Sequence, residues 1–199
     1  MAEQQNEVLA TLKDTVANPG PLGLMAFGMT TVLLNIHNAG FFGMNTMILA
    51  MGIFYGGIAQ VIAGWQEFKK TNTFGAMAFS SYGLFWLTLV GLIVLPKWTG
   101  VDAPNATAMG WYLMMWGIFT GLMYIGTLRI NRSLQTVFLS LTILFVLLAV
   151  SEWSGSSTVG KIAGWEGIFV GFSAVYGSIA QVLNELYGRV VLPLGPAKK

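Results

Sequence analysis

Charge is what this sequence has least of. Only 9% of its 199 residues are charged and 55% are hydrophobic, whereas an ordinary soluble domain is roughly 25% charged. This balance excludes a soluble enzyme. It also excludes a disordered chain, which needs low hydrophobicity and high charge. We therefore expect a membrane protein.

Cysteine is absent and histidine occurs once. The absence of cysteine excludes disulfides, thiolate metal ligands and thiol nucleophiles together. A single histidine, His37, makes no metal cluster, and a formal charge of +2 gives no basic face that could track phosphates. We expect no metal, no cofactor and no nucleic-acid partner.

Long charge-free runs divide the chain into membrane spans. Residues 15–66 contain no Asp, Glu, Lys or Arg, enough for two crossings of about 20 residues each. Four later runs of the same kind predict one span each. The six predicted spans are Leu22–Ile36, Thr46–Trp65, Phe74–Leu95, Ala108–Leu128, Ser133–Val150 and Ala163–Leu183. The predicted fold is an all-α, polytopic bundle of six transmembrane helices at 18–193, between a cytoplasmic head at 1–17 and a cytoplasmic tail at 194–199.

The basic residues predict the orientation. Six spans place both termini on one side, with eight of the ten basic residues: Lys13, Lys69, Lys70, Arg129, Arg132, Arg189, Lys198 and Lys199. Lys97 and Lys161 lie on the other side. The excess predicts that both termini are cytoplasmic, and the head lacks the features of a signal peptide. Five tryptophans fall at predicted span ends, as membrane interfaces favour. We expect a multi-pass protein of a bacterial or archaeal cell (inner) membrane.

Glycine is abundant, at 25 residues. The GxxxG spacing, which lets membrane helices approach closely, occurs at Gly52/Gly56, Gly117/Gly121 and Gly167/Gly171. Short loops make successive spans antiparallel neighbours. If these glycine faces point outward, they favour association into a ring-like homo-oligomer, although a monomer is compatible with the sequence.

Catalysis has no support inside the spans. An intramembrane protease needs paired aspartates, a metal motif or a serine with a histidine partner. We expect no acid in the middle of a span, and His37 lies at the outer end of the first one. His37 is read either as a hydrogen-bonded interfacial residue or as a residue with a direct transport role. The protein is predicted not to be an enzyme.

Neutral polar residues are frequent within the spans. Thr30, Asn35 and Gln60 are examples, and a buried amide without a partner costs several kcal/mol in lipid, so these groups should face other helices or water. They can serve as hydrogen-bonding glue between helices or line a path for a small polar solute. For Asn35 and Gln60 both interpretations stay open.

The segment NPGPLGL at residues 18–24 precedes the first span. Pro19 and Pro21 suit the start of a helix, where a missing donor is tolerated. Free amides at this helix N-terminus would favour a carboxylate without any Arg or Lys. This segment therefore predicts an anion-attracting mouth on the cytoplasmic side.

The same segment resembles the NPAPLGL signature of the acetate uptake transporter family, with Gly20 where the family usually has Ala. The matching signature positions are Asn18, Pro19, Pro21, Leu22, Gly23 and Leu24. The similarity continues through GMTTVLLNIHN at 28–38, ILAMGIFYGGIAQ at 48–60, SYGLFW at 81–86, DAPN at 102–105 and NELYGR at 184–189. It covers most of residues 18–193.

The resemblance implies a six-helix bundle, assembled as a hexamer, with a path for acetate and small monocarboxylates through each protomer. By matched motif, the family's apolar constriction corresponds to Phe27, Tyr82 and Leu141. Thr30, Asn35 and Gln60 are the expected polar, substrate-binding groups on that path. Succinate is expected only as a poorer substrate.

The mechanism follows from the charge of the substrate. Moving one acetate anion inward against an inside-negative potential costs about 2.3 kcal/mol per 100 mV, and desolvating it at an apolar ring adds several more. Uptake is therefore expected to be proton-linked, although a channel that dissipates a gradient fits equally well. Two alternatives are a neutral-solute channel for ammonia or water and a non-transporting membrane interaction protein.

Overall fold

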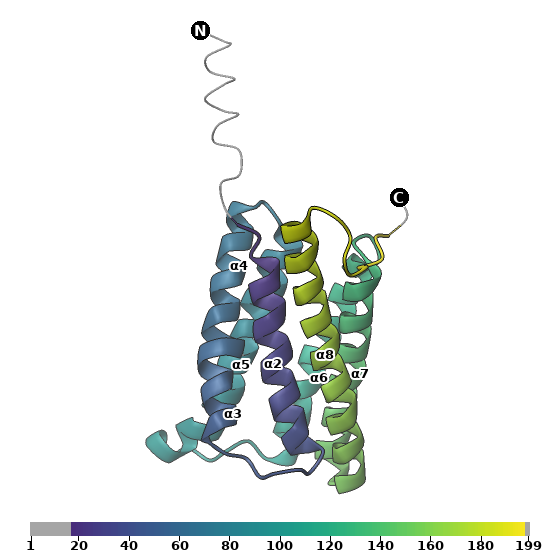
Figure 1. The fold of residues 1–199 in the computed structure, drawn as a ribbon. Coiled ribbons are helices and arrows are strands. Elements are labelled where there is room, and N and C mark those ends of the chain that lie inside the picture. The colour runs from purple at the N-terminus through teal and green to yellow at the C-terminus, as the bar shows by residue number, and fades with distance from the viewer. Residues whose placement is uncertain (1–16, 198–199) are drawn as a thin grey trace.

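The computed structural model describes residues 17–197, and all regular elements in this range are helical. They are α2 (Gly20–Asn38), α3 (Thr46–Ala50), the π-helix η1 (Met51–Ala59), α4 (Gln60–Lys69), α5 (Thr73–Thr99), α6 (Ala106–Thr127), α7 (Arg132–Ser154) and α8 (Ser157–Tyr187). Because α3, η1 and α4 follow one another without a break, the described chain forms six rods packed side by side (Figure 1). The predicted head at 1–17 lies almost wholly outside the described residues.

Five of these rods are long and apolar enough to cross a membrane: Thr46–Lys69, α5, α6, α7 and α8. The sixth, α2, has 19 residues, or about 28 Å at 1.5 Å per residue, close to the roughly 30 Å of a bilayer core. The six rods match the six predicted spans. The chain is an all-helical polytopic membrane protein.

Local sequence signals set the helix ends. An Asn or Ser side chain accepts a hydrogen bond from a first-turn amide, which satisfies a donor without an intrahelical partner. These caps are Asn45, Asn72, Asn105, Asn131 and Ser156. Helices α5, α7 and α8 end at glycines in the left-handed conformation, which a glycine adopts without strain.

Glycine allows the backbones of α2 and α8 to touch. A β-carbon at Gly28 would lie 2.7 Å from the carbonyl oxygen of Gly171, and one at Gly171 would lie 2.8 Å from that of Gly28. The three GxxxG motifs likewise face other helices of the same chain, against partners such as Trp86, Phe145 and Asn35. The three motifs therefore pack within the protomer, and the condition under which they would favour association between protomers is not met.

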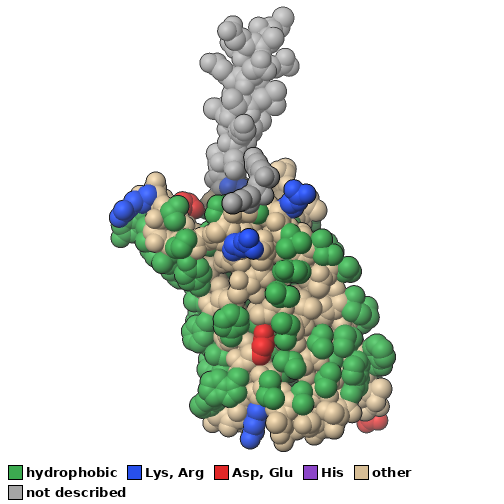
Figure 2. Space-filling model, turned by 90° about the vertical axis from the view of Figure 1, so that its right-hand side faces the viewer, with side chains coloured by type: hydrophobic (Ala, Val, Ile, Leu, Met, Phe, Trp, Pro, Cys, Tyr) green, Lys and Arg blue, Asp and Glu red, His purple; other side chains and the backbone are tan. Residues whose placement is uncertain are grey.

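The outer surface suits a bilayer. Large apolar side chains such as Phe54, Leu122 and Phe172 are well exposed, and Figure 2 shows hydrophobic side chains along one lateral face with basic side chains gathered toward one end. The five tryptophans predicted at span ends are all exposed: Trp65, Trp98, Trp111, Trp153 and Trp165.

The alternation of the rods places Asn18 and the C-terminal segment at the same end of the bundle (Figure 1). The basic residues of the described chain at this end are Lys69, Lys70, Arg129, Arg132 and Arg189, and we call it the basic end. Lys97 and Lys161 belong to the opposite end. That the basic end is cytoplasmic stays a prediction.

Candidate functional site

A cavity of about 480 Å³ lies at the basic end of the bundle, and we call it the vestibule. Its walls come from α2, α4, α5, α7, α8 and the C-terminal segment. Polar groups of the lining include Asn18, Gln60, Glu67, Lys70, Asn72, Asn131 and Gln181. The remaining lining is mostly aliphatic and aromatic. The vestibule is large enough to hold several waters or a small polar molecule.

Three largely apolar side chains from three helices line the deeper part of the vestibule. Phe27 of α2, Tyr82 of α5 and Leu141 of α7 all line it, and each is buried to 4% exposure or less. The rings of Phe27 and Tyr82 lie 5.8 Å apart between centroids. The structure therefore brings together the three residues that the resemblance assigned to the constriction, seven to nine positions into their helices.

The hydroxyl proton of Tyr82 is engaged in a hydrogen bond within the protein. Its hydroxyl donates to Thr120 Oγ1 at 2.9 Å, and Thr120 in turn donates to the carbonyl of Trp116 at 2.7 Å. The phenolic oxygen can then only accept a hydrogen bond from a further group. A protonated acid, which carries an O–H, satisfies this acceptor; a carboxylate does not.

Aromatic packing fills the bundle beyond Tyr82. Phe85 lies 5.2 Å from both Trp116 and Phe145, centroid to centroid, in edge-on contacts. Trp86 is 2% exposed, one turn beyond Tyr82 on α5. The inner end of the vestibule is therefore closed in this conformation.

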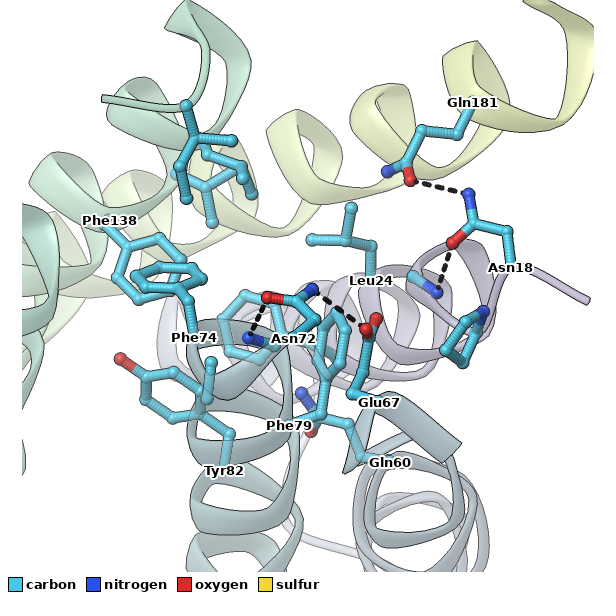
Figure 3. A pocket seen from close by; sticks show the side chains of 18 of the residues that line it. Asn18, Leu24, Gln60, Glu67, Asn72, Phe74, Phe79, Tyr82, Phe138 and Gln181 are labelled. Atoms are coloured by element: carbon cyan, nitrogen blue, oxygen red, sulfur yellow. Dashed lines mark hydrogen bonds between the residues drawn. The ribbon is translucent and has the colours of Figure 1, made fainter. Parts of the chain in front are cut away.

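The signature segment forms one wall of the mouth. Pro19 precedes the first residue of α2, and the amide of Gly20 donates to Asn18 Oδ1 at 3.0 Å. Asn18 also donates to Gln181 Oε1 at 3.3 Å, which ties the start of α2 to α8 (Figure 3). The prediction of free amides is therefore wrong for Gly20, whose N–H already has a partner.

Close packing requires a small residue at position 23 of the signature, whereas at position 20 the nearest neighbour is the end of a flexible side chain. The ring of Phe79 lies against Gly23, 2.5 Å from where a β-carbon would be. At position 20, where the family usually has Ala, a β-carbon would lie 2.8 Å from the Oε1 atom at the end of the Gln181 side chain.

Gln60 and Glu67 enter the vestibule from α4. Gln60 is 1% exposed, and its Oε1 atom has no hydrogen-bond partner. Glu67 is 4% exposed, and its Oε2 atom accepts a hydrogen bond from Asn72 at 2.8 Å. In Figure 3, Glu67 and Asn72 point toward each other beside the cavity. Gln60 was expected on the path; Glu67 was not.

Thr30 and Asn35, the other expected polar groups, do not line the vestibule. Thr30 is buried, with its hydroxyl 3.5 Å from the carbonyl oxygen of Met51. Asn35 donates to the carbonyl of Thr31 at 2.9 Å and packs against Gly167 of α8. In this conformation both make contacts between helices, the structural alternative raised from the sequence. A role in substrate binding stays a prediction.

His37 lies near the opposite end of α2. Its Nδ1 atom lies 2.7 Å from the carbonyl oxygen of Phe42, and the side chain is partly buried. This contact corresponds to the hydrogen-bonded interpretation of His37.

The C-terminal segment covers part of the mouth. The amides of Arg132 and Ser133 donate to the carbonyls of Gly195 and Leu194, at 2.7 and 3.0 Å, so this segment satisfies the first donors of α7. Leu194 lines the vestibule. The predicted tail at 194–199 is, as far as residue 197, part of the packed structure.

One acid lies inside a predicted span, near its start and not in its middle: Glu166 of the span Ala163–Leu183. Glu166 is the tenth residue of the 31-residue helix α8, partly buried, with its Oε2 atom unpartnered. Helix α8 begins at Ser157, ten residues before the charge-free run that starts at residue 167, so Glu166 belongs to the helix although it lies outside that run.

These features define a class: a multi-pass membrane protein of the transporter or channel type, not an enzyme. The sequence profile of the GPR1/FUN34/yaaH family matches residues 2–196, and the chain belongs to this family.

The chain is similar to relatives along nearly its whole length. It is 57% identical over 180 residues to the succinate-acetate/proton symporter SatP of Escherichia coli strain K12, covering 90% of this chain and 96% of that protein. It is 52% identical over 194 residues to an uncharacterized protein of Methanothermobacter thermautotrophicus, covering 94% and 95%. A solved structure described as the bacterial acetate channel SatP superposes with a TM-score of 0.89, at 57% identity, over 91% of this chain and 100% of that one.

Proposed function

We propose that this chain moves acetate and similar small carboxylates across the cell (inner) membrane of a bacterium or archaeon, with succinate as a poorer substrate. The path runs through the vestibule and past Phe27, Tyr82 and Leu141. The observation that carries the proposal is the convergence of these three side chains, from three helices, deep in a cavity that opens at the basic end. The similarity to SatP of Escherichia coli supports acetate as the substrate.

Phe27, Tyr82 and Leu141 form the proposed constriction, which we call the ring. The substrate passes this ring in its neutral form, or together with a proton. Two free acceptors lie in the deeper vestibule, Tyr82 Oη and Gln60 Oε1. An ionised carboxylate offers only acceptors, so it cannot bond to these two oxygen atoms, and it would carry its charge past the apolar side chains of Phe27 and Leu141. A protonated acid donates its O–H to either group and carries no charge past the apolar ring.

The protomers associate as homo-oligomers, hexamers by family resemblance, and each protomer contains its own path. Because the vestibule is enclosed by helices of one chain, transport does not need a pore between subunits. Light scattering of the purified protein in detergent tests the association.

Purified protein in vesicles tests the function. Labelled acetate uptake is measured at several external pH values, with uptake by protein-free vesicles subtracted because neutral acetic acid crosses lipid. The proposal expects protein-dependent acetate uptake that accelerates on external acidification. Indifference to pH would contradict the proton link.

Urea, glycerol and ammonia are the comparison solutes. Protein-dependent flux of these solutes without acetate would support the neutral-solute channel. No flux of any solute would support the non-transporting interaction protein.

A further inference from the structure

Glu67 is the one acidic side chain among residues 17–197 that lines the vestibule, and the path proposed above assigns it no role. It projects from the last turn of α4 and is 4% exposed. Asn72 donates to its Oε2 atom at 2.8 Å, and Gly75 of α5 packs against its carboxyl carbon. A carboxyl group is thus held rigidly at the wall of a cavity that, on the proposed function, admits carboxylates.

Few other groups of the lining carry or exchange charge. Besides Glu67, the described side chains that line the vestibule with charge, a titratable proton or a polar amide are Gln60 of α4, Lys70 and Asn72 between α4 and α5, Tyr82 of α5, Asn18 before α2, Asn131 before α7 and Gln181 of α8. Lys70 interacts electrostatically with Glu67. A substrate carboxylate in this space therefore shares the site with the Glu67 carboxyl group. Two carboxyl groups confined together hold a proton between them, because like charges at short distance disfavour double ionisation.

Gln60 lies deeper in the vestibule than Glu67, because α4 runs toward the basic end. It precedes Glu67 by seven residues on the same helix, which places both on one face about 10 Å apart along the axis. Its Oε1 atom is buried, at a residue exposure of 1%, and has no partner. Glu67, Gln60 and Tyr82 thus give a proton-binding group near the mouth followed by two acceptors for an acid O–H.

We propose that Glu67 is the proton-binding residue of the vestibule and exchanges a proton with the substrate before or after the ring. Protonated Glu67 donates its O–H to a carboxylate oxygen of the anion. When the proton transfers, the new O–H bond is on the substrate and Glu67 is left as a carboxylate, which regains a proton from water at the basic end. In the reverse direction the neutral acid gives its proton to Glu67 and leaves as the anion. Ionised Glu67 repels the anion, so substrate binding is acid-activated.

The test compares variants in vesicles with equal pH inside and outside. The half-saturating acetate concentration is measured at pH 6.0 and 7.5 for wild type, Glu67→Gln and Glu67→Asp. Substrate protonation is common to all three proteins, so it cancels in the comparison at each pH. In Glu67→Gln the side chain at position 67 is neutral at both pH values. At pH 7.5 the half-saturating acetate concentration should be at least threefold lower than in wild type, and it should depend less on pH. Glu67→Asp should retain the wild-type trend.

Two further variants sharpen the result. Glu185→Gln removes an exposed carboxylate at the same end of the bundle but outside the vestibule, and should behave as wild type. Asn72→Ser keeps a capping oxygen for α5 but removes the amide donor to Glu67, so the midpoint of acid activation should move to higher pH. This second variant keeps the test decisive if Glu67→Gln does not fold.

Folded Glu67→Gln with the wild-type pH dependence, or Asn72→Ser with an unmoved midpoint, overturns the inference. The proposed function fails separately, when the wild-type protein itself shows no protein-dependent acetate uptake.

Discussion

Replacing Leu141 by alanine enlarges the narrowest part of the proposed path. Leu141 is 2% exposed and lines the vestibule beside Phe27 and Tyr82. The substitution removes three carbons and destabilises a buried site by about 2–5 kcal/mol. We expect the lower end of that range, because the new space joins an existing cavity that water can enter.

The wider path should also weaken the discrimination against acids larger than acetate. Lactate exceeds acetate by one carbon and one oxygen atom, and even a single extra methylene in a fitted apolar pocket changes discrimination by about 1–3 kcal/mol, or 10–200-fold. The ratio of lactate to acetate uptake in vesicles should therefore rise at least about tenfold in Leu141→Ala.

Leu144→Ala is the matched control for this experiment. Leu144 is equally buried, one turn along α7, but does not line the vestibule, so its truncation should leave the ratio unchanged. A folded Leu141→Ala protein with the wild-type ratio would show that Leu141 does not bound the path. An equal rise in both variants would attribute the effect to general loosening of α7.

Three other predictions address the ring, the packing and the orientation. Tyr82→Phe removes a buried hydrogen bond to Thr120 and an acceptor on the path, each worth about 1 kcal/mol; loss of the acceptor should slow acetate uptake about fivefold while the protein still folds, and unchanged rates would remove Tyr82 from the path. Gly83→Ala places a β-carbon 2.8 Å from the carbonyl oxygen of Gly57 and should lower stability by about 1–3 kcal/mol, seen as a lower thermal unfolding temperature, whereas an unchanged temperature would contradict the close approach of α5 and η1. In this cysteine-free chain, Asp102→Cys should react with a membrane-impermeant maleimide in intact cells and Arg189→Cys only after permeabilisation; the opposite pattern would invert the orientation.

The six rods were predictable because charge is excluded from the bilayer core, so gaps in the charge pattern mark the spans. The capping residues Asn72, Asn105 and Asn131 are also local signals, since an Asn side chain before an apolar helix accepts a hydrogen bond from one of its first amides. The ring of Phe27, Tyr82 and Leu141 was predictable only from family resemblance. Its members lie on three helices, and no spacing in the sequence indicates that they meet.

Glu67 was missed because charge patterning treats an acid at the edge of a charge-free run as a span boundary. Its burial depends on Asn72 and Gly75 from the next helix, which only the tertiary structure brings to it. Thr30 and Asn35 illustrate the converse, because a polar residue within a span looks the same in sequence whether it faces a helix or a cavity.

Chemical modification at position 141 tests the central claim most directly. The chain has no cysteine, so Leu141→Cys provides a single thiol at the ring, and a small neutral methanethiosulfonate can reach it through the vestibule. If the acid passes this point in each protomer, modification should reduce acetate uptake at least tenfold, and acetate should slow the modification. Complete modification, verified by mass spectrometry, with unchanged acetate uptake would contradict the account.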